Sequence, residues 1–167
     1  MARWTILGVV VALAGRGWVD AQSAQAPAAA QAAPGPPSRG VTIHQEGDLD
    51  APPERIYEAL LDTRKFEAFS LAHAEINREV GGAFTIFDGH IVGRNVELVP
   101  NRRIVQAWRV VDWPEGVYSI ARFDLTPREK GTHLVLDHTG FPEALKDHLA
   151  AGWTEHYWER LRKYLAS

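Results

Sequence analysis

The chain has 167 residues, no cysteine and a formal net charge of −3. This length suits a single domain with an appendage. The basic residues are scattered, with only short pairs such as Arg102–Arg103, which argues against a nucleic-acid partner because such proteins need a clustered basic face. Without cysteine there are no disulfides and no lipoprotein anchor, so stability depends on the hydrophobic core.

The N-terminus has the pattern of an export signal. Arg3 precedes the apolar run Trp4–Gly15, which is shorter than the roughly 20 residues that a membrane-spanning helix needs. The small residues Val19 and Ala21 fit cleavage after Ala21. We therefore predict a signal peptide over residues 1–21, a periplasmic or secreted protein, and no stable membrane span after cleavage. An uncleaved N-terminal anchor is the alternative.

The next segment separates this signal from the globular part. Residues 22–40 are mainly Ala, Pro, Gln, Ser and Gly, with almost no large apolar side chain. Such a composition cannot offset the entropy lost on ordering, so a disordered linker is predicted. Residues 41–167 then form the domain, which is long enough for one buried core.

The domain begins with a predicted strand and a short helix. Val41–Leu49 alternates loosely between apolar and polar residues, as a strand does. Asp50 is expected to cap a helix over Pro52–Leu61, since Asp is a good N-cap and Pro is tolerated in a first helical turn. A second short helix or an irregular corner is expected at Thr63–Ser70, with Phe66 and Phe69 facing inward.

Six further strands follow, separated by turn signals such as Gly81-Gly82 and Asp88-Gly89. Period-two alternation puts Trp108, Phe123 and His138 on inner faces and charged side chains on the opposite, solvated faces, as in an antiparallel sheet with one wet side. Pro127 is expected to end the fifth of these strands. The predicted strands are Ala72–Glu79, Ala83–Phe87, His90–Val99, Arg103–Val111, Val117–Thr126 and Thr132–His138.

One long amphipathic helix is predicted over Glu143–Ala166. Apolar and aromatic residues recur there at helical spacing, and charged residues mostly take the other side. At about 1.5 Å per residue the helix spans roughly 35 Å, enough to cross a whole sheet. The inward-facing residues include Leu149, Trp153, His156 and Tyr157.

With these elements in place, the chain resembles the SRPBCC superfamily, and within it the START-like group related to the C-terminal domain of the heat-shock-protein-90 ATPase activator. The resemblance covers nearly all of residues 41–166. Besides the C-terminal helix, it is carried by APPERIYEAL at Ala51–Leu60, VGGAF at Val80–Phe84, VELVPNRRIVQAW at Val96–Trp108 and GTHLVLDHTGF at Gly131–Phe141.

This resemblance implies an α+β helix-grip fold, in which a curved antiparallel sheet of about seven strands wraps around the long C-terminal helix. Two short helices follow the first strand. The sequence departs from the family at Phe66 and Phe69, where a Trp-containing segment is common, and in its export signal. The family is functionally diverse and has no shared catalytic signature, so the fold alone does not assign a function.

The space between sheet and helix is the candidate site. We expect it to bind a small hydrophobic or amphipathic molecule, since ligand sites are mostly apolar concavities with a few placed polar groups. His138 and Tyr157 are expected to orient a polar end. The predicted lining is Ile56, Leu60, Phe84, Trp108, Phe123, Leu136, His138, Leu149, Trp153 and Tyr157.

His138 allows three interpretations at this point: an acid–base catalyst, an anchor for a ligand headgroup, or a member of a satisfied core network. No metal site or cofactor is predicted, because the seven histidines lack an HExxH or comparable spacing and no cysteine is present. His148 and His156 lie about two turns apart, so they share a helix face without chelating one ion.

Two other functions remain open. Some members of the superfamily resemble cyclases and hydrolases that use the same cavity, which makes an enzyme the first alternative. The second is a protein-interaction module similar to the chaperone activator domain; this alternative would require a large exposed apolar patch and a closed interior. The sequence does not indicate the oligomeric state.

Overall fold

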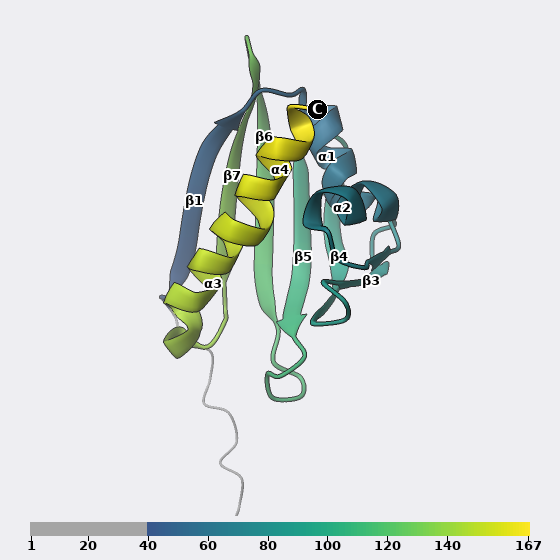
Figure 1. Cartoon of the computed structure of the whole chain (residues 1–167). Helices are drawn as coiled ribbons and strands as arrows, with labels where there is room; N and C mark the ends of the chain where they lie inside the picture. The colour runs from purple at the N-terminus through teal and green to yellow at the C-terminus, as the bar shows by residue number, and fades with distance from the viewer. Residues whose placement is uncertain (1–39) are drawn as a thin grey trace, which may run out of the picture. The chain divides into compact units, whose positions relative to one another are not determined.

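The computed structural model describes residues 40–167 (Figure 1). The predicted signal peptide and the linker up to residue 39 lie outside the described residues and stay predictions. Within residues 40–167, no helix is both long and apolar enough to cross a bilayer.

The described chain forms the predicted curved antiparallel sheet, with its strands in the order β1-β7-β6-β5-β4-β3-β2. From β2 to β7 each strand pairs with the next one along the chain, and β7 also pairs with β1, so the first and last strands of the sequence are neighbours. The strands are β1 (Thr42–Leu49), β2 (Glu75–Ile76), β3 (Ala83–Ile86), β4 (Ile91–Val99), β5 (Arg103–Val110), β6 (Ser119–Arg128) and β7 (Gly131–Thr139).

Two strands differ from the prediction by more than one residue at an end. β2 is far shorter than the predicted Ala72–Glu79. β6 does not end at Pro127 but continues to Arg128. The reason lies in the neighbours: β5 pairs with β6 only as far as Asp124, while β7 pairs with β6 to its end. Proline has no backbone N–H to donate to a neighbouring strand. A strand tolerates this lack where one of its edges is free.

Two short helices follow β1, as predicted: α1 (Pro53–Leu61) and α2 (Thr63–Ser70). The expected cap at Asp50 is wrong, because Pro52 occupies the N-cap position of α1 and no side chain caps it. Asp62 instead caps α2, its carboxylate accepting a hydrogen bond from the Lys65 backbone N–H at 3.0 Å.

The C-terminal helix crosses one face of the sheet diagonally, and α1 and α2 lie beside its last turns (Figure 1). Arg55 of α1 joins them by donating to the Leu165 carbonyl at 2.7 Å. The helix occupies the predicted residues but is not uniform: its successive parts are the 3₁₀ turn η1 (Glu143–Leu145), α3 (Lys146–Gly152), the π-helical segment η2 (Trp153–Trp158) and α4 (Glu159–Leu165).

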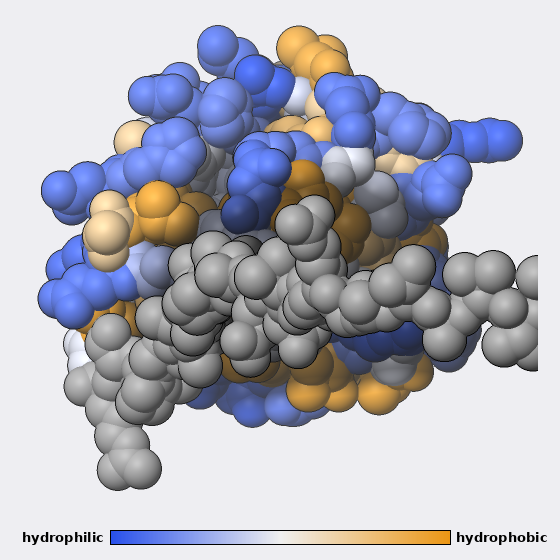
Figure 2. Space-filling model, turned by 90° about the horizontal axis from the view of Figure 1, so that it is seen from below, coloured by the Kyte–Doolittle hydropathy of each residue, from blue (hydrophilic) through white to orange (hydrophobic). Residues whose placement is uncertain are grey.

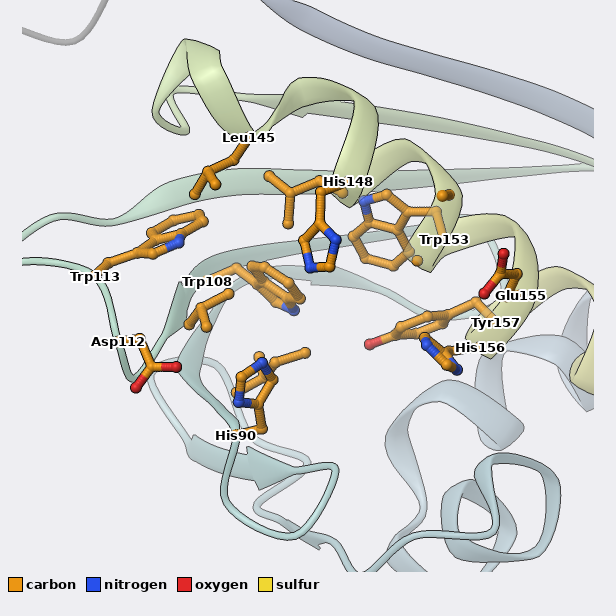
Figure 3. A pocket seen from close by; sticks show the side chains of 15 residues that line it. His90, Trp108, Asp112, Trp113, Leu145, His148, Trp153, Glu155, His156 and Tyr157 are labelled. Carbon is orange, nitrogen blue, oxygen red and sulfur yellow. The ribbon is translucent and has the colours of Figure 1, made fainter.

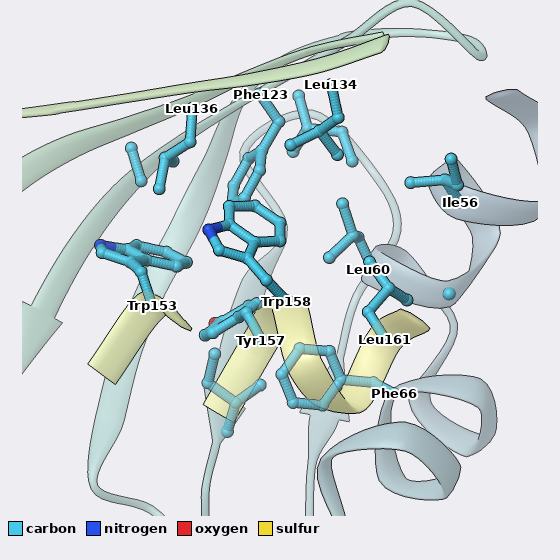
Figure 4. Packing of buried hydrophobic residues seen from close by; sticks show 14 of the residues in the cluster. Ile56, Leu60, Phe66, Phe123, Leu134, Leu136, Trp153, Tyr157, Trp158 and Leu161 are labelled. Atoms are coloured by element: carbon cyan, nitrogen blue, oxygen red, sulfur yellow. The ribbon is translucent and has the colours of Figure 1, made fainter. Parts of the chain in front are cut away.

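The hydrophobic core fills the space between the sheet, the C-terminal helix and the two short helices (Figure 4). Phe123 and Leu136 point down from the sheet, and Trp158 and Leu161 meet them from the helix. The predicted inner faces of β5, β6 and β7 are confirmed, since the alternating side chains of each are buried.

Gly131, at the start of β7, is required by its backbone. Its φ is +96°, and a Cβ there would collide with the Leu49 carbonyl oxygen of β1. We expect Gly131→Ala to lower the free energy of unfolding by more than about 2 kcal/mol, because left-handed strain and the collision add. Urea denaturation measures this difference.

Gly116 provides the matched control. Its φ is +79°, but no atom lies within 4 Å of the place that an alanine methyl would take, so Gly116→Ala should cost only about 1 kcal/mol. Equal losses for the two variants would contradict the role assigned to the β1 contact.

Candidate functional site

A cavity of about 540 Å³ opens at one end of the C-terminal helix (Figure 3). It lies between the start of β4, the end of β5 with the loop that follows, and the helical segments η1, α3 and η2. Its lining is His90, Ile91, Trp108, Val110, Asp112, Trp113, Leu145, His148, Leu149, Ala151, Gly152, Trp153, Glu155, His156 and Tyr157.

The cavity has an aromatic floor and a polar rim. The side chains of Trp108, Trp113, Trp153 and Tyr157 are buried and form the floor. The rim is exposed, and hydrophilic residues alternate with hydrophobic ones on this end of the molecule (Figure 2). The exposed ionisable side chains of the rim are His90, Asp112, His148, Glu155 and His156.

The π-helical segment contributes two side chains to the floor, Trp153 and Tyr157. Its wider turn lets Tyr157 and Trp158, which are consecutive in the sequence, both turn inward, and both are buried. The Trp153 ring contacts the Tyr157 ring at a centroid distance of 4.4 Å and is stacked on Trp158 at 6.2 Å. Segments of this kind are rare and are frequent at functional sites.

Gln45 of β1 forms hydrogen bonds with two residues of this irregular part of the C-terminal helix. Its Nε2 donates to the Ala150 carbonyl at 3.0 Å, and its Oε1 accepts from the Trp158 Nε1–H at 2.5 Å. A backbone carbonyl beside a change of helix type needs such partners, because an unsatisfied polar group destabilises the fold.

Trp113 reaches the floor from the loop between β5 and β6. The Arg109 guanidinium fixes this loop by donating to the carbonyls of Val111 at 3.0 Å and Trp113 at 2.6 Å. The Trp113 ring then meets Trp108 edge-on at a centroid distance of 6.1 Å.

His138 lies in the middle of a series of hydrogen bonds that runs from the Trp153 side chain to the Trp108 backbone. The Trp153 indole donates to His138 Nδ1 at 3.0 Å. Because an indole N–H only donates, Nδ1 must accept, so Nε2 carries the proton and donates to Ser119 Oγ at 2.7 Å. Ser119 in turn donates to the Trp108 carbonyl at 2.9 Å.

Both ring nitrogens of His138 are therefore occupied. Burial lowers the pKa of His138 to about 3, so the ring is neutral at physiological pH. The side chain is fully buried and is not part of the cavity lining. This geometry favours the core-network interpretation of His138 over a catalyst or a headgroup anchor.

The structure brings four of the ten predicted site residues together at the cavity: Trp108, Leu149, Trp153 and Tyr157. The other six are buried in the core outside its lining, because sheet and helices pack in direct contact there (Figure 4). Phe123, for example, meets the Trp153 ring at a centroid distance of 5.6 Å. The six are Ile56, Leu60, Phe84, Phe123, Leu136 and His138.

The predicted lining contains none of the exposed ionisable residues of the rim. Helical spacing predicted that His156 faces inward with Tyr157, yet His156 is exposed because the π turn rotates it outward. The shared helix face of His148 and His156 was recognisable from their spacing, and both line the cavity. Nothing in the sequence around Trp113 pointed to the site, since this residue lies in a loop.

Two polar groups meet on the floor. Burial raises the pKa of Tyr157 above its ordinary value of 10.0, and the adjacent Trp108 indole N–H lowers it only in part. The Trp108 Nε1 is itself buried and has no hydrogen-bond partner among the described residues. Within residues 40–167 no group of His, Asp and Glu side chains is arranged to hold a metal ion.

Comparison with known proteins agrees with this architecture. The family model described as "Activator of Hsp90 ATPase homolog 1-like protein" matches residues 50–166. The mouse activator of 90 kDa heat shock protein ATPase homolog 2 is 32% identical over 125 residues, which cover 75% of this chain. The match covers only 38% of the mouse protein.

Solved structures show the same fold. An HSP90 activator from Plasmodium falciparum superposes with a TM-score of 0.73 and 26% identity, covering 76% of this chain and 97% of that one. A protein from Chromobacterium violaceum gives a TM-score of 0.63 and 30% identity, with 75% and 97% covered. With its START-like helix-grip fold and a match over most of the domain, the chain belongs to the family of Activator of Hsp90 ATPase homolog 1-like proteins.

Proposed function

We propose that the protein binds one small hydrophobic or amphipathic molecule in the cavity at the end of the C-terminal helix. The observation that carries this proposal is an opening of about 540 Å³ whose buried floor consists of aromatic rings. Small-molecule sites typically measure about 300–1,000 Å³ and combine an apolar lining with a few polar groups.

The energetics of such a site are favourable. Removing apolar ligand surface from water contributes about 25 cal/mol per Å² before ordering costs are subtracted. Those costs are low here, because the floor is already ordered by ring contacts such as Trp108–Trp153 at a centroid distance of 5.6 Å. Arg109 likewise fixes Trp113 before any ligand arrives.

Titration of the full-length protein with N-phenyl-1-naphthylamine, a neutral fluorescent probe, tests the proposal. We expect saturable binding of one probe molecule, which native mass spectrometry counts. Ala151 lines the cavity and is exposed, so Ala151→Trp places a large ring in the opening. This variant should weaken probe binding by about tenfold or more, since about 1.4 kcal/mol corresponds to a factor of ten.

Ala144 supplies the matched control. It is exposed on the same helix but lies outside the cavity lining, so Ala144→Trp should bind the probe like the wild type. If both tryptophan variants bind equally well, the probe sits elsewhere and the proposed site is wrong.

An interaction module is the second candidate. Curated relatives of this chain carry the name of Hsp90 ATPase activators, and two apolar side chains, Tyr118 and Ile120, are 50% and 40% exposed near and on β6. Ile120 lies on the face turned away from the helix, since Ser119 and Ala121 on either side of it are buried. Partner binding through this face would depend on Ile120 and be unaffected by Ala151→Trp.

A further inference from the structure

We propose that the ligand of this cavity is a flat, uncharged molecule with a carbonyl oxygen, and that the Tyr157 hydroxyl donates a hydrogen bond to that oxygen. This inference rests on the proposed function, because it names the chemical class of the molecule that the cavity binds. Three features support it: the direction of the Tyr157 hydroxyl, its Trp108 neighbour and a lining without lysine or arginine.

Tyr157 presents a fixed hydroxyl. The residue is 4% exposed, and its hydroxyl points into the open centre of the cavity (Figure 3). Its polar neighbour is the Trp108 indole, whose Nε1 has no hydrogen-bond partner among residues 40–167. The ring cannot easily swing away, because Phe66 and Phe87 hold it edge-on at centroid distances of 5.9 and 5.4 Å.

Trp108 adds a second donor beside this hydroxyl. Its Nε1 lies on the side of the indole that faces the Tyr157 oxygen (Figure 3) and has no hydrogen-bond partner among the described residues. An indole N–H only donates, so this nitrogen requires an acceptor atom. A ligand oxygen placed between the two side chains accepts from both of them.

The floor favours an uncharged acceptor over a carboxylate. Within the described chain the cavity lining contains no Lys or Arg, and a buried anion without a counter-charge is strongly disfavoured. Asp112 and Glu155 on the rim would also repel an anion. The rim histidines His90, His148 and His156 are exposed, so water screens any charge they carry.

The indole rings of the floor favour a ligand with a flat ring skeleton. The Trp108 ring lies between two other indoles, with Trp113 at a centroid distance of 6.1 Å and Trp153 at 5.6 Å. Aromatic faces and edges of this kind pack best against another ring system. A fused-ring ketone therefore matches both the shape of the cavity and the hydroxyl donor of Tyr157.

Three probes with one skeleton test the inference: 9-fluorenone, fluorene and fluorene-9-carboxylate, each titrated into the full-length protein by calorimetry. We expect 9-fluorenone to bind about five- to tenfold more tightly than fluorene, as one net hydrogen bond provides. Tyr157→Phe should abolish this preference while its affinity for fluorene stays unchanged, which also shows that the variant folds. Trp108→Phe should reduce the preference.

The outcomes separate this inference from the proposed function. Equal binding of 9-fluorenone and fluorene by the wild type would leave the hydrophobic site in place and overturn the role of Tyr157. Tightest binding of the carboxylate would overturn the choice of an uncharged ligand in favour of an anion at the rim. If none of the three probes binds, the proposed function itself fails, and the inference fails with it.

Discussion

Replacing Trp153 with alanine is expected to lower the free energy of unfolding by about 4 kcal/mol, as large-to-small changes of buried aromatic residues do. Trp153 is the largest fully buried side chain among residues 40–167. Its ring contacts Trp108, Phe123 and Trp158, so its loss leaves a void at the meeting point of sheet and helix. Urea denaturation at pH 7 measures the change.

Trp153→Phe separates packing from hydrogen bonding. The smaller ring keeps most of the aromatic contacts but removes the indole N–H that donates to His138 Nδ1. We expect a loss of about 1–3 kcal/mol, the cost of leaving a buried acceptor unsatisfied. A loss below about 1 kcal/mol for Trp153→Ala would mean that this part of the helix does not pack as the structure shows.

Acid is expected to destabilise the protein through His138. The unfolded chain binds a proton at this side chain below its ordinary pKa of 6.5, whereas burial lowers the pKa in the folded protein to about 3. Between these values unfolding takes up a proton, so the free energy of unfolding falls as the pH falls from 6.5 toward 3. The total loss is about 4–5 kcal/mol, and it is absent above pH 6.5.

His138→Gln is the control for this pH dependence. An amide can accept from Trp153 and donate to Ser119 without titrating, so denaturation between pH 7 and pH 4 should show a shallower slope for the variant than for the wild type. His44, whose pKa Asp137 raises, acts with the opposite sign but is present in both proteins and cancels in the comparison. Parallel pH profiles would contradict the assignment to His138.

The fold was largely predictable because its signals are local. Turn dipeptides such as Gly81-Gly82 and Asp88-Gly89 mark the hairpins, and both lie between consecutive strands of the sheet. Alternation within β5, β6 and β7 identified their buried faces. The end of β6 was not predictable in this way, because whether Pro127 is tolerated depends on which neighbouring strand has already ended.

The site was only partly predictable, because it depends on where packing stops. Alternation and helical spacing indicate which side chains turn inward, and they gave Trp108, Trp153 and Tyr157 correctly as inward residues. They do not show that the rings meet along most of the helix and leave a space only at one end. The π-helical turn adds a further difficulty, since it changes the spacing that placed His156 inward.

The pairing of β1 with β7 also affects how the chain is made. Thr42 lies opposite Thr139, so the sheet closes only when nearly the whole domain has left the ribosome. Contacts between such distant residues slow folding, since a long loop must close before they form. Until then β1, which leaves the ribosome first, stays unpaired on the nascent chain, and the domain is most open to aggregation or to a chaperone in that interval.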